Sequence, residues 1–456
     1  MIKKHLSLLL VSILVILIAI SIALSAIMVL RPVSLFSTNT VNDTSKKITN
    51  VQNRLATPQE EVFKPTRYIH VGEDYFYMTT DQSVLNATNK LLHESIKDLE
   101  KAETLSYSTY EQLIFKNSSS VLLFDGPITI GAMNGYFGNY ASELEQELFD
   151  TIVIGQNNDV YLINSVTKAV VKGQIPSEIV TNLAELYRTN STQFETSNTY
   201  VTKQGLVFLQ KQEIKAKKQT YIVEQPSSSF FIEQFYTNTT ELRNRSDDTT
   251  VKYNDNVSQL EINKNTNILT YFRNRGTNEN LSQTVDIQQS FASLRRLENW
   301  KFGISYAGYQ SNTSIVSFYR YINNYPILDK NQEGIIHMVV TESGIEKVRL
   351  PISIAQTLLT NRDEEVTLVS GEEAVAVLLE QGIDLTNVED IRIGYSWNIS
   401  SENNKVVEYV PEWYVKINSK WHSLASVSSS TTQQEEKPET ELSKQEPTNT
   451  EGDGNE

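Results

Sequence analysis

The chain has 456 residues, of which 39% are hydrophobic and 21% are charged, and its formal net charge at pH 7 is -15. It has no cysteine, which excludes disulfides, thiol catalysis, thiolate metal sites and lipid attachment through a thiol. The acidic balance argues against a nucleic-acid binder, because such proteins present a basic surface to phosphates.

Residues 6–30 form one uncharged apolar run that is interrupted only by serines. A helix of this length extends about 37 Å, which is enough to cross a hydrocarbon core of about 30 Å. Lys3 and Lys4 precede the run and Arg31 follows it. The short, positively charged N-terminal side favours the cytoplasm. The run therefore predicts a single-pass protein of the cell membrane, with residues 1–5 cytoplasmic and the bulk of the chain extracytoplasmic.

A cleaved signal peptide is the alternative interpretation of this run. Small residues between Ser21 and Ala26 offer a cleavage site. Signal peptides have a shorter apolar core, of about 7 to 15 residues, whereas this run stays apolar through Leu30. We therefore expect a retained membrane anchor.

The same run contains overlapping pairs of small residues. Ala19 with Ala23, and Ser21 with Ser25, have the small-xxx-small spacing. Such pairs let membrane helices approach closely, and serine hydroxyls bond across the contact. These four residues are a candidate transmembrane contact.

Residues 31–65 are rich in serine, threonine and asparagine and predict a stalk. Folded sequence is expected from residue 66. Asp81 or Ser83 is a candidate N-cap for a helix whose apolar residues, from Val84 to Leu99, recur at helical spacing. Together with the elements that follow, this helix predicts an N-terminal α+β domain over residues 66–200. Those elements are strands at 121–124, 151–154 and 160–164 and a helix at 176–187.

Residues 201–280 predict a middle α+β domain. Its expected elements are a helix at 227–236 and strands at 205–209, 220–223, 251–253 and 268–272. A helix that starts at Leu281 and closes near Trp300 is expected to open a C-terminal α+β domain over residues 281–425. Strands are expected there at 314–322 and 334–340, with a third ending at Pro351.

The C-terminal domain contains the clearest local signals. Ser370 to Glu373 match a capping box at the start of a helix. Residues 391–397 and 406–417 predict a hairpin, with Trp413, Val415 and Ile417 on one face and Tyr414 and Lys416 on the other. The predicted fold class is α+β with mainly antiparallel sheets, and the last two domains have a similar layout.

The C-terminal tail, residues 426–456, is acidic and almost free of apolar groups. It holds eight acidic residues against two lysines. Such a composition cannot bury enough surface to offset the entropy of ordering the chain. The tail is predicted to be disordered.

The sequence offers no recognisable catalytic or cofactor site. No two of the histidines His70, His93, His337 and His422 have the i, i+3 or i, i+4 spacing that presents paired imidazoles to zinc. The glycines of residues 131–138 lack both the P-loop lysine and dinucleotide spacing. Ser305 resembles a nucleophile elbow only if one residue is ignored, so a strand serine is the better interpretation. No catalytic residue, cofactor or metal is therefore predicted.

Charged clusters in the body are better explained as solvated faces. Asp363 to Glu365 and Asp247-Asp248 are adjacent acids, whereas acid–base pairs are normally assembled from separated elements. Four lysines at 211, 215, 217 and 218 form a basic run. A run of this kind is able to meet anionic wall polymer or lipid headgroups, and a solvated face is the simpler interpretation.

Four segments of the C-terminal domain resemble the YycH (WalH) family of Gram-positive bacteria. They occur in a fixed order and are packing and turn motifs, so no active site is carried over. They are Asn324-Tyr-Pro-Ile327, Val366 to Val375, Ile391-Arg-Ile-Gly-Tyr395 and Pro411-Glu-Trp-Tyr-Val415. The resemblance implies three extracytoplasmic domains, the last two similar to each other and to a partner protein, YycI.

The resemblance also implies a non-catalytic, membrane-anchored regulator. With a YycI-like membrane protein, such a regulator modulates the WalK sensor histidine kinase of the WalKR two-component system, which controls cell-wall metabolism. The alternative functions are an exported adhesin or passive envelope protein and, less readily, a wall-modifying enzyme. An enzyme would need a convergent polar constellation, which the sequence does not display.

Overall fold

The computed structural model describes residues 57–274, 281–329, 331–400, 403 and 405–429, all within one compact unit, Leu55–Glu456. The strands pair antiparallel and are accompanied by helices, which confirms the predicted α+β class with mainly antiparallel sheets. None of the helices in these ranges is both long and apolar enough to span a bilayer. Several sequence predictions concern residues outside the described ranges: the span 6–30, Lys3, Lys4, Arg31, Ala19, Ser21, Ala23, Ser25, most of the stalk and residues 430–456.

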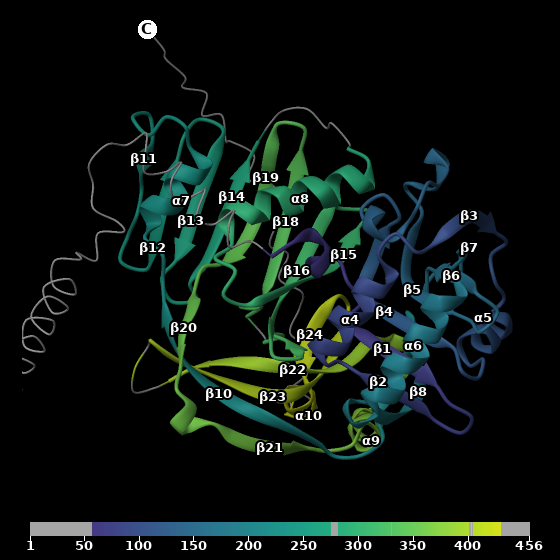
Figure 1. Ribbon diagram of the computed structural model, residues 1–456. Helices are drawn as coiled ribbons and strands as arrows, with labels where there is room; N and C mark the ends of the chain where they lie inside the picture. Colours follow the sequence, from purple (N-terminus) through teal and green to yellow (C-terminus); the bar gives the residue numbers. More distant parts are fainter. Residues whose placement is uncertain (1–56, 275–280, 330, 401–402, 404, 430–456) are drawn as a thin grey trace, which may run out of the picture. The chain divides into compact units, whose positions relative to one another are not determined.

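The first sheet has nine strands in the order β3-β7-β6-β5-β4-β1-β2-β8-β9. Helices α4 and α6 pack against each other on one face of this sheet (Figure 1). The strands are β1 Arg67–Val71, β2 Phe76–Thr79, β3 Lys97–Ala102, β4 Ser120–Thr129, β5 Leu148–Ile154, β6 Asp159–Ile163, β7 Val170–Gln174, β8 Glu195–Thr202 and β9 Gly205–Gln210. The helices are α3 Gln59–Val62, α4 Gln82–Leu92, α5 Tyr107–Ile114 and α6 Ser177–Thr189, with short 3-10 turns η1 Asn134–Tyr136, η2 Ser142–Leu144 and η3 Ser191–Gln193.

Helix α4 begins as the sequence predicts and ends earlier. The Asp81 carboxylate accepts hydrogen bonds from the backbone N–H groups of Ser83 and Val84, so Asp81 is the N-cap. The helix stops at Leu92, and the prediction that its apolar face continues through Leu99 is wrong. Backbone N–H groups beyond the helix bond to the carbonyls of residues 135 and 136 instead, which starts the path into edge strand β3.

The second sheet has six strands in the order β20-β10-β23-β22, with β21 paired to β10 and β24 paired to β23. Its long hairpin, β22 with β23, confirms the predicted hairpin. Trp413 and Val415 point into an apolar core, as their alternation predicts. The elements are β10 Ile214–Glu224, β20 Ile354–Leu358, β21 Glu364–Leu368, β22 Val388–Ile399, β23 Val406–Ile417, β24 Lys420–Ser423, α9 Gly371–Glu380, α10 Leu424–Ser429, η4 Thr360–Arg362 and η5 Leu385–Asn387.

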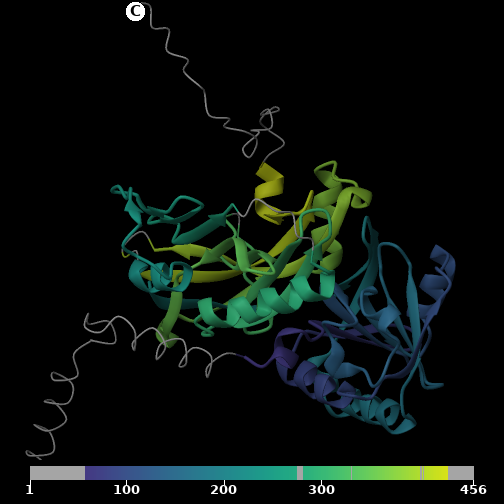
Figure 2. The ribbon, with the colours of Figure 1, turned by 90° about the horizontal axis from the view of Figure 1, so that it is seen from above.

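The third sheet also has nine strands, in the order β11-β12-β13-β14-β19-β18-β16-β15 with β17 paired to β16. Helix α8 lies across one face of it through buried Ile287, Phe291 and Leu294 (Figure 2). The elements are β11 Arg243–Asn244, β12 Thr250–Asn254, β13 Ser258–Asn263, β14 Ile268–Arg273, β15 Gly303–Gln310, β16 Ile315–Ile322, β17 Tyr325–Pro326, β18 Ile335–Thr341, β19 Gly344–Pro351, α7 Ser228–Phe235 and α8 Gln283–Leu297.

Strands from residues 201–280 pair with strands of both neighbouring segments. Strand β9 pairs with β8, strand β10 pairs with β20, β21 and β23, and β14 pairs with β19. The sheets are therefore assembled from strands far apart in the sequence. The division into three domains at residues 200 and 280, and the similar layout of the last two, stay predictions.

A close backbone contact joins the first sheet to the third. A Cβ on Gly126 of β4 would lie 2.4 Å from the carbonyl oxygen of Ala307 and 2.6 Å from Cα of Gly308 on β15. Gly308 has a φ of +132°, which L side chains rarely adopt. The Tyr306 hydroxyl donates to the Pro127 carbonyl at 2.7 Å. Only glycine on both strands allows this approach, and a pocket opens beside it.

Candidate functional site

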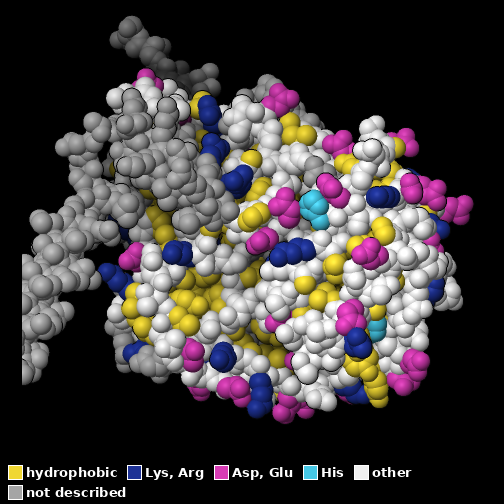
Figure 3. Space-filling view, in the orientation of Figure 1, with side chains coloured by type: hydrophobic (Ala, Val, Ile, Leu, Met, Phe, Trp, Pro, Cys, Tyr) yellow, Lys and Arg dark blue, Asp and Glu magenta, His cyan; other side chains and the backbone are white. Residues whose placement is uncertain are grey.

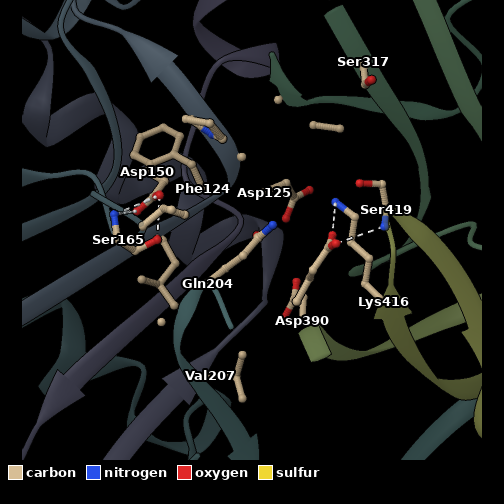
Figure 4. A pocket seen from close by; sticks show the side chains of 18 of the residues that line it. Phe124, Asp125, Asp150, Ser165, Gln204, Val207, Ser317, Asp390, Lys416 and Ser419 are labelled. Carbon is tan, nitrogen blue, oxygen red and sulfur yellow. Dashed lines mark hydrogen bonds and ion pairs between the residues drawn. The ribbon is translucent and has the colours of Figure 1, made fainter. Parts of the chain in front are cut away.

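A polar pocket of about 250 Å³ lies between the first sheet and the other two. Figure 4 shows Asp150 and Ser165 on one side, Lys416 and Ser419 on the other, and Asp125 between them. The first group comes from β5 and the turn after β6, and the second from β23 and the turn after it. The pocket is thus a product of tertiary structure, because no single element supplies both walls.

An ion cluster built on Arg392 lies beside the pocket, and three of its members, Asp125, Asp390 and Arg67, line it. Asp390 and Arg392 are two apart on β22 and therefore share a face of the strand. The Arg392 guanidinium donates to Asp390 at 2.9 Å through Nε and to Asp125 of β4 at 2.5 Å through Nη1. Arg67 of β1 lies 3.5 Å from Asp390. Two acids and two bases from opposite walls therefore neutralise one another.

Hydroxyl groups and an aromatic ring complete this cluster. Asp125 also accepts hydrogen bonds from the Tyr321 hydroxyl at 2.6 Å and the Thr66 hydroxyl at 2.7 Å. The Arg392 guanidinium carbon lies 5.3 Å from the centre of the Trp421 ring, a cation–π distance. The Asp125 side chain is fully buried and that of Arg392 is 9% exposed, so water does little to screen their interaction.

Burial and ion pairing act in opposite directions on the charged groups of the cluster. Burial disfavours the ionised form of Asp390, but Arg392 and Arg67 outweigh it and hold the pKa of Asp390 below its ordinary value. Burial likewise disfavours the guanidinium, but Asp125 and Asp390 raise the pKa of Arg392 well above its usual range. Both residues are therefore charged at neutral pH.

The left wall of Figure 4 holds a second buried carboxylate. Asp150 accepts hydrogen bonds from the Ser165 hydroxyl at 2.7 Å, the Thr151 hydroxyl at 2.8 Å and the Ser165 backbone N–H at 3.1 Å. Burial raises the pKa of Asp150, and these hydrogen bonds only partly offset the shift. This carboxylate is anchored by its own neighbours and does not join the Arg392 cluster.

The opposite wall presents Lys416. The register places Lys416 opposite Asp390 on β22 and opposite Trp421 on β24. Its ammonium lies 3.9 Å from Glu389 Oε2, an oxygen that has no hydrogen-bond partner. The Ser419 backbone N–H donates to the other Glu389 oxygen at 3.0 Å. The pocket therefore offers charges of both signs at short range.

A serine–histidine pair also lines the pocket. Ser317 Oγ lies 2.9 Å from His337 Nδ1. Burial, with Arg349 and Lys416, lowers the pKa of His337 to about 4. A serine nucleophile needs a basic imidazole oriented by a carboxylate, and within the described part of the chain no hydrogen bond or ion pair joins this ring to one. The pair is a poor arrangement for acyl transfer.

The histidines singled out in the sequence do not meet. His70 stacks on the Tyr187 ring with centroids 3.8 Å apart, and burial lowers its pKa. His93 is exposed at the end of α4, and His422 is exposed on β24. Across the described ranges, no group of three or more His, Cys, Asp or Glu side chains is placed to hold a metal ion.

Other sequence candidates occupy structural positions. Ser305 is a buried strand residue of β15, as predicted. The glycine-rich residues 131–138 form turns around η1. Asp247 is exposed and accepts hydrogen bonds from the Thr249 hydroxyl and from the backbone N–H groups of Thr249 and Thr250, which lower its pKa. None of these groups lines the pocket.

The basic run and one acidic cluster lie opposite each other. The β10–β21 register pairs Lys217 with Glu365 and Lys218 with Glu364. Lys215 lies 3.1 Å from Glu365, and Lys218 lies 3.0 Å from Glu408. Acidic and basic side chains are likewise interspersed on the face shown in Figure 3. The lysine run is thus a paired, solvated face, which was the simpler interpretation of the sequence.

Sequence reasoning missed the ion cluster beside the pocket. Asp125 was not singled out from the sequence, and Arg392 was included only within the motif Ile391 to Tyr395. Arg392 and Asp125 are 267 positions apart. The available signal was a charged pair, Asp390 with Arg392, that alternates with the apolar residues Ile391 and Ile393 in a predicted strand. Buried charges are rare unless they are paired.

Comparison with known proteins gives the family. The family model described as YycH protein, C-terminal domain, matches residues 204–431. The chain belongs to the YycH family. No curated protein matches the sequence.

Solved structures extend the likeness beyond the matched region. The crystal structure of YycH from Bacillus subtilis is similar with a TM-score of 0.67 at 15% identity, over 81% of this chain and 97% of that chain. At this identity the match shows a shared fold. The Bacillus megaterium YpeB C-terminal domain gives a TM-score of 0.23 at 12% identity, over 43% of this chain and 91% of that chain, which does not indicate a common fold.

Proposed function

We propose that this chain is a membrane-anchored, non-catalytic regulator of a WalK-like sensor histidine kinase and acts with a YycI-like membrane protein. The observation that carries the proposal is the match of the YycH family model to residues 204–431, since YycH proteins are regulators. The fold shared with Bacillus subtilis YycH supports it. Cell-wall metabolism is the process such a kinase controls.

The apolar run supports the membrane part of the proposal. Residues 6–30 anchor the protein with residues 1–5 in the cytoplasm, and the folded body lies on the extracytoplasmic side. The chain has no cysteine, so topology is testable with one introduced thiol. We expect Glu342→Cys, in an exposed turn after β18, to react with a membrane-impermeant maleimide in intact cells. Protection of that thiol until the cells are lysed would contradict this orientation.

Regulation requires differential binding. A regulator shifts a two-state kinase only by as much as it binds one state more tightly than the other. The membrane helix contacts the kinase through Ala19, Ser21, Ala23 and Ser25, and the folded body binds the partner. The ion cluster around Arg392 connects β22 to β1 and β4. This connection supports the view that the folded body acts as one rigid unit when it binds the partner.

The decisive experiment replaces residues 6–30 with an unrelated span of equal length. Kinase-dependent transcription and co-purification with kinase and partner are measured for the intact and swapped proteins. We expect both to fall in the swapped protein. Full retention of both would remove the membrane helix from the mechanism. Absence of co-purification even with the intact chain would reject the regulator and leave an adhesin or passive envelope protein.

A finer variant pair tests the small-residue contact. Ala19→Ile with Ala23→Ile enlarges the candidate contact, and Ser7→Ile adds the same side chain near the start of the run as a matched control. We expect the double variant to lose co-purification with the kinase while the control keeps it. Equal behaviour of both variants would argue against this face.

A further inference from the structure

The polar pocket between the sheets takes part of its wall from a β-bulge in β22. Val388 pairs with Ile417 and Asp390 pairs with Lys416, so Glu389 is an extra residue between two adjacent pairs. Successive residues of a regular strand point to opposite faces, whereas a bulge bends the strand and redirects its side chains. Glu389 and Asp390 both line the pocket, although they are neighbours in the chain.

Glu389 brings to the pocket a buried carboxylate that the protein satisfies on one oxygen only. Its side chain is 6% exposed. The Ser419 backbone N–H donates to Oε1 at 3.0 Å, and among the described residues Oε2 has no hydrogen-bond partner. The Lys416 ammonium lies 3.9 Å from Oε2, which is an ion-pair distance but too long for a hydrogen bond. Oε2 is therefore a free acceptor on a charged group.

Arg67 brings an unsatisfied donor of the opposite charge to the same pocket. Its side chain is 12% exposed, and one terminal nitrogen of its guanidinium, Nη1, lies 3.5 Å from an Asp390 oxygen. The inner nitrogen, Nε, has no hydrogen-bond partner in the part of the chain that the structure describes. Arg67 comes from β1 of the first sheet and Glu389 from β22 of the second. A free cationic donor and a free anionic acceptor therefore line one pocket from two sheets.

The charges around the pocket determine which class of ligand it favours. An unsatisfied donor or acceptor on a buried charged group is costly unless a ligand or ordered water completes its hydrogen bonds. The ion pairs beside the pocket join three bases to three acids, namely Arg67, Arg392 and Lys416 with Asp125, Asp390 and Glu389. A simple anion or cation would leave one charge in excess there. A ligand that carries both a cationic donor and an anionic acceptor completes both free groups and keeps the balance.

The volume and the remaining lining select a small, polar ligand. The volume of about 250 Å³ corresponds to about eight water molecules at about 30 Å³ each. Asp150, on the other wall, is satisfied by donors of its own. Figure 4 shows Gln204, from the turn between β8 and β9, pointing into the space between the walls. Its amide adds a donor and an acceptor for a polar ligand.

We propose that this pocket binds a free α-amino acid with a small side chain. Its ammonium group pairs with Oε2 of Glu389, and its carboxylate pairs with Nε of Arg67 and the ammonium of Lys416. An α-amino acid is a zwitterion at neutral pH, so one molecule supplies both partners and adds no net charge. Binding is reversible and involves no chemical step. The inference is independent of the kinase partner.

The test measures binding to the full chain in detergent micelles, with glycine, alanine and serine as the probes. Saturation-transfer NMR follows the signals of the small molecule itself and therefore detects weak binding. We expect at least one of the three to bind with a dissociation constant of about 1 mM or lower.

Two analogues of the best-bound amino acid test its two charges separately. The deaminated acid lacks the ammonium group and the decarboxylated amine lacks the carboxylate, and both are smaller than the amino acid, so neither is excluded by size. We expect each analogue to bind the intact protein at least about tenfold more weakly, because a buried charged group then stays unpaired.

The matched variants are Glu389→Gln and Glu408→Gln. Each replaces an acid of the β22–β23 hairpin that forms an ion pair with a lysine, since Glu408 lies 3.0 Å from Lys218. Only Glu389 lines the pocket. We expect Glu389→Gln to weaken binding of the best probe at least about tenfold, while Glu408→Gln leaves it unchanged. If Glu389→Gln fails to fold, the two analogues on the intact chain still decide.

Three results would overturn the inference. The first is that none of the three amino acids binds the intact protein, which leaves the pocket to ordered water. The second is that the deaminated acid or the decarboxylated amine binds as tightly as the amino acid. The third is that Glu389→Gln and Glu408→Gln retain binding equally, which places the amino acid elsewhere on the protein.

Discussion

Arg392→Met is the perturbation that tests most directly how the pocket is held together. Methionine keeps an apolar stem against Trp421 and removes the charge. Among the described residues, the change leaves Asp125 with two hydroxyl donors and no cation within ion-pair distance. Asp390 keeps one ion pair, with Arg67 at 3.5 Å. Because the Asp125 side chain is fully buried, its charge cannot be solvated by water.

The expected cost follows from that burial. Removing one partner of a buried ion pair typically costs about 3 to 5 kcal/mol, because the other charge stays buried and unpaired. The surface pair Lys215–Glu365, with side chains 70% and 57% exposed, is the internal comparison, and its loss should cost about 1 kcal/mol or less. Arg392→Met should therefore lower the free energy of unfolding several times more than Glu365→Gln.

Urea unfolding of the detergent-solubilised full chain, followed by tryptophan fluorescence, measures both variants. A double-mutant cycle with Asp125→Asn isolates the cause. If the stranded Asp125 charge dominates, the Asp125→Asn/Arg392→Met double variant should be more stable than the two single costs predict, by about 1 to 3 kcal/mol. Equal costs for Arg392→Met and Glu365→Gln, or additive costs in the cycle, would refute the reasoning.

Three further predictions rest on single contacts. His337 has a pKa lowered from 6.5 to about 4, so the unfolded chain binds a proton that the folded one does not. Stability should fall as the pH drops from 6.5 towards 4, by up to about 1.4 kcal/mol per pH unit, and His337→Gln should lack this component in urea titrations at each pH. Gly126→Ala places a methyl group 2.4 Å from the Ala307 carbonyl oxygen and should lower stability by about 1 to 3 kcal/mol, whereas an unchanged thermal midpoint would mean that the strands separate easily. Ser370→Ala removes the hydroxyl of the capping box with Glu373 and should cost about 1 kcal/mol in urea, with Ser343→Ala in an exposed turn as the near-neutral control.

Local structure could be predicted where the sequence carries its own start signal or alternation. The Asp81 cap of α4 and the Ser370–Glu373 capping box of α9 appear where expected. The hairpin 388–417 also appears, with Trp413 and Val415 in one apolar cluster and Tyr414 buried in another. The predicted end of α4 was wrong because the backbone N–H groups of Glu94 and Ile96 donate to the distant carbonyls of Gly135 and Tyr136. The spacing of apolar residues carries no information about such long-range hydrogen bonds.

The sequence by itself determined the absence of thiol chemistry, the acidic charge, the apolar run at residues 6–30 and the caps and alternation of individual elements. These depend on residue type and on neighbours within a few positions. Only the tertiary structure decided that Asp125 meets Arg392, that Lys218 faces Glu364 and that Asp329 and Glu333 are buried together. Such contacts depend on which strands pair and in which register, and a shift of one residue would turn the side chains of a strand to its opposite face.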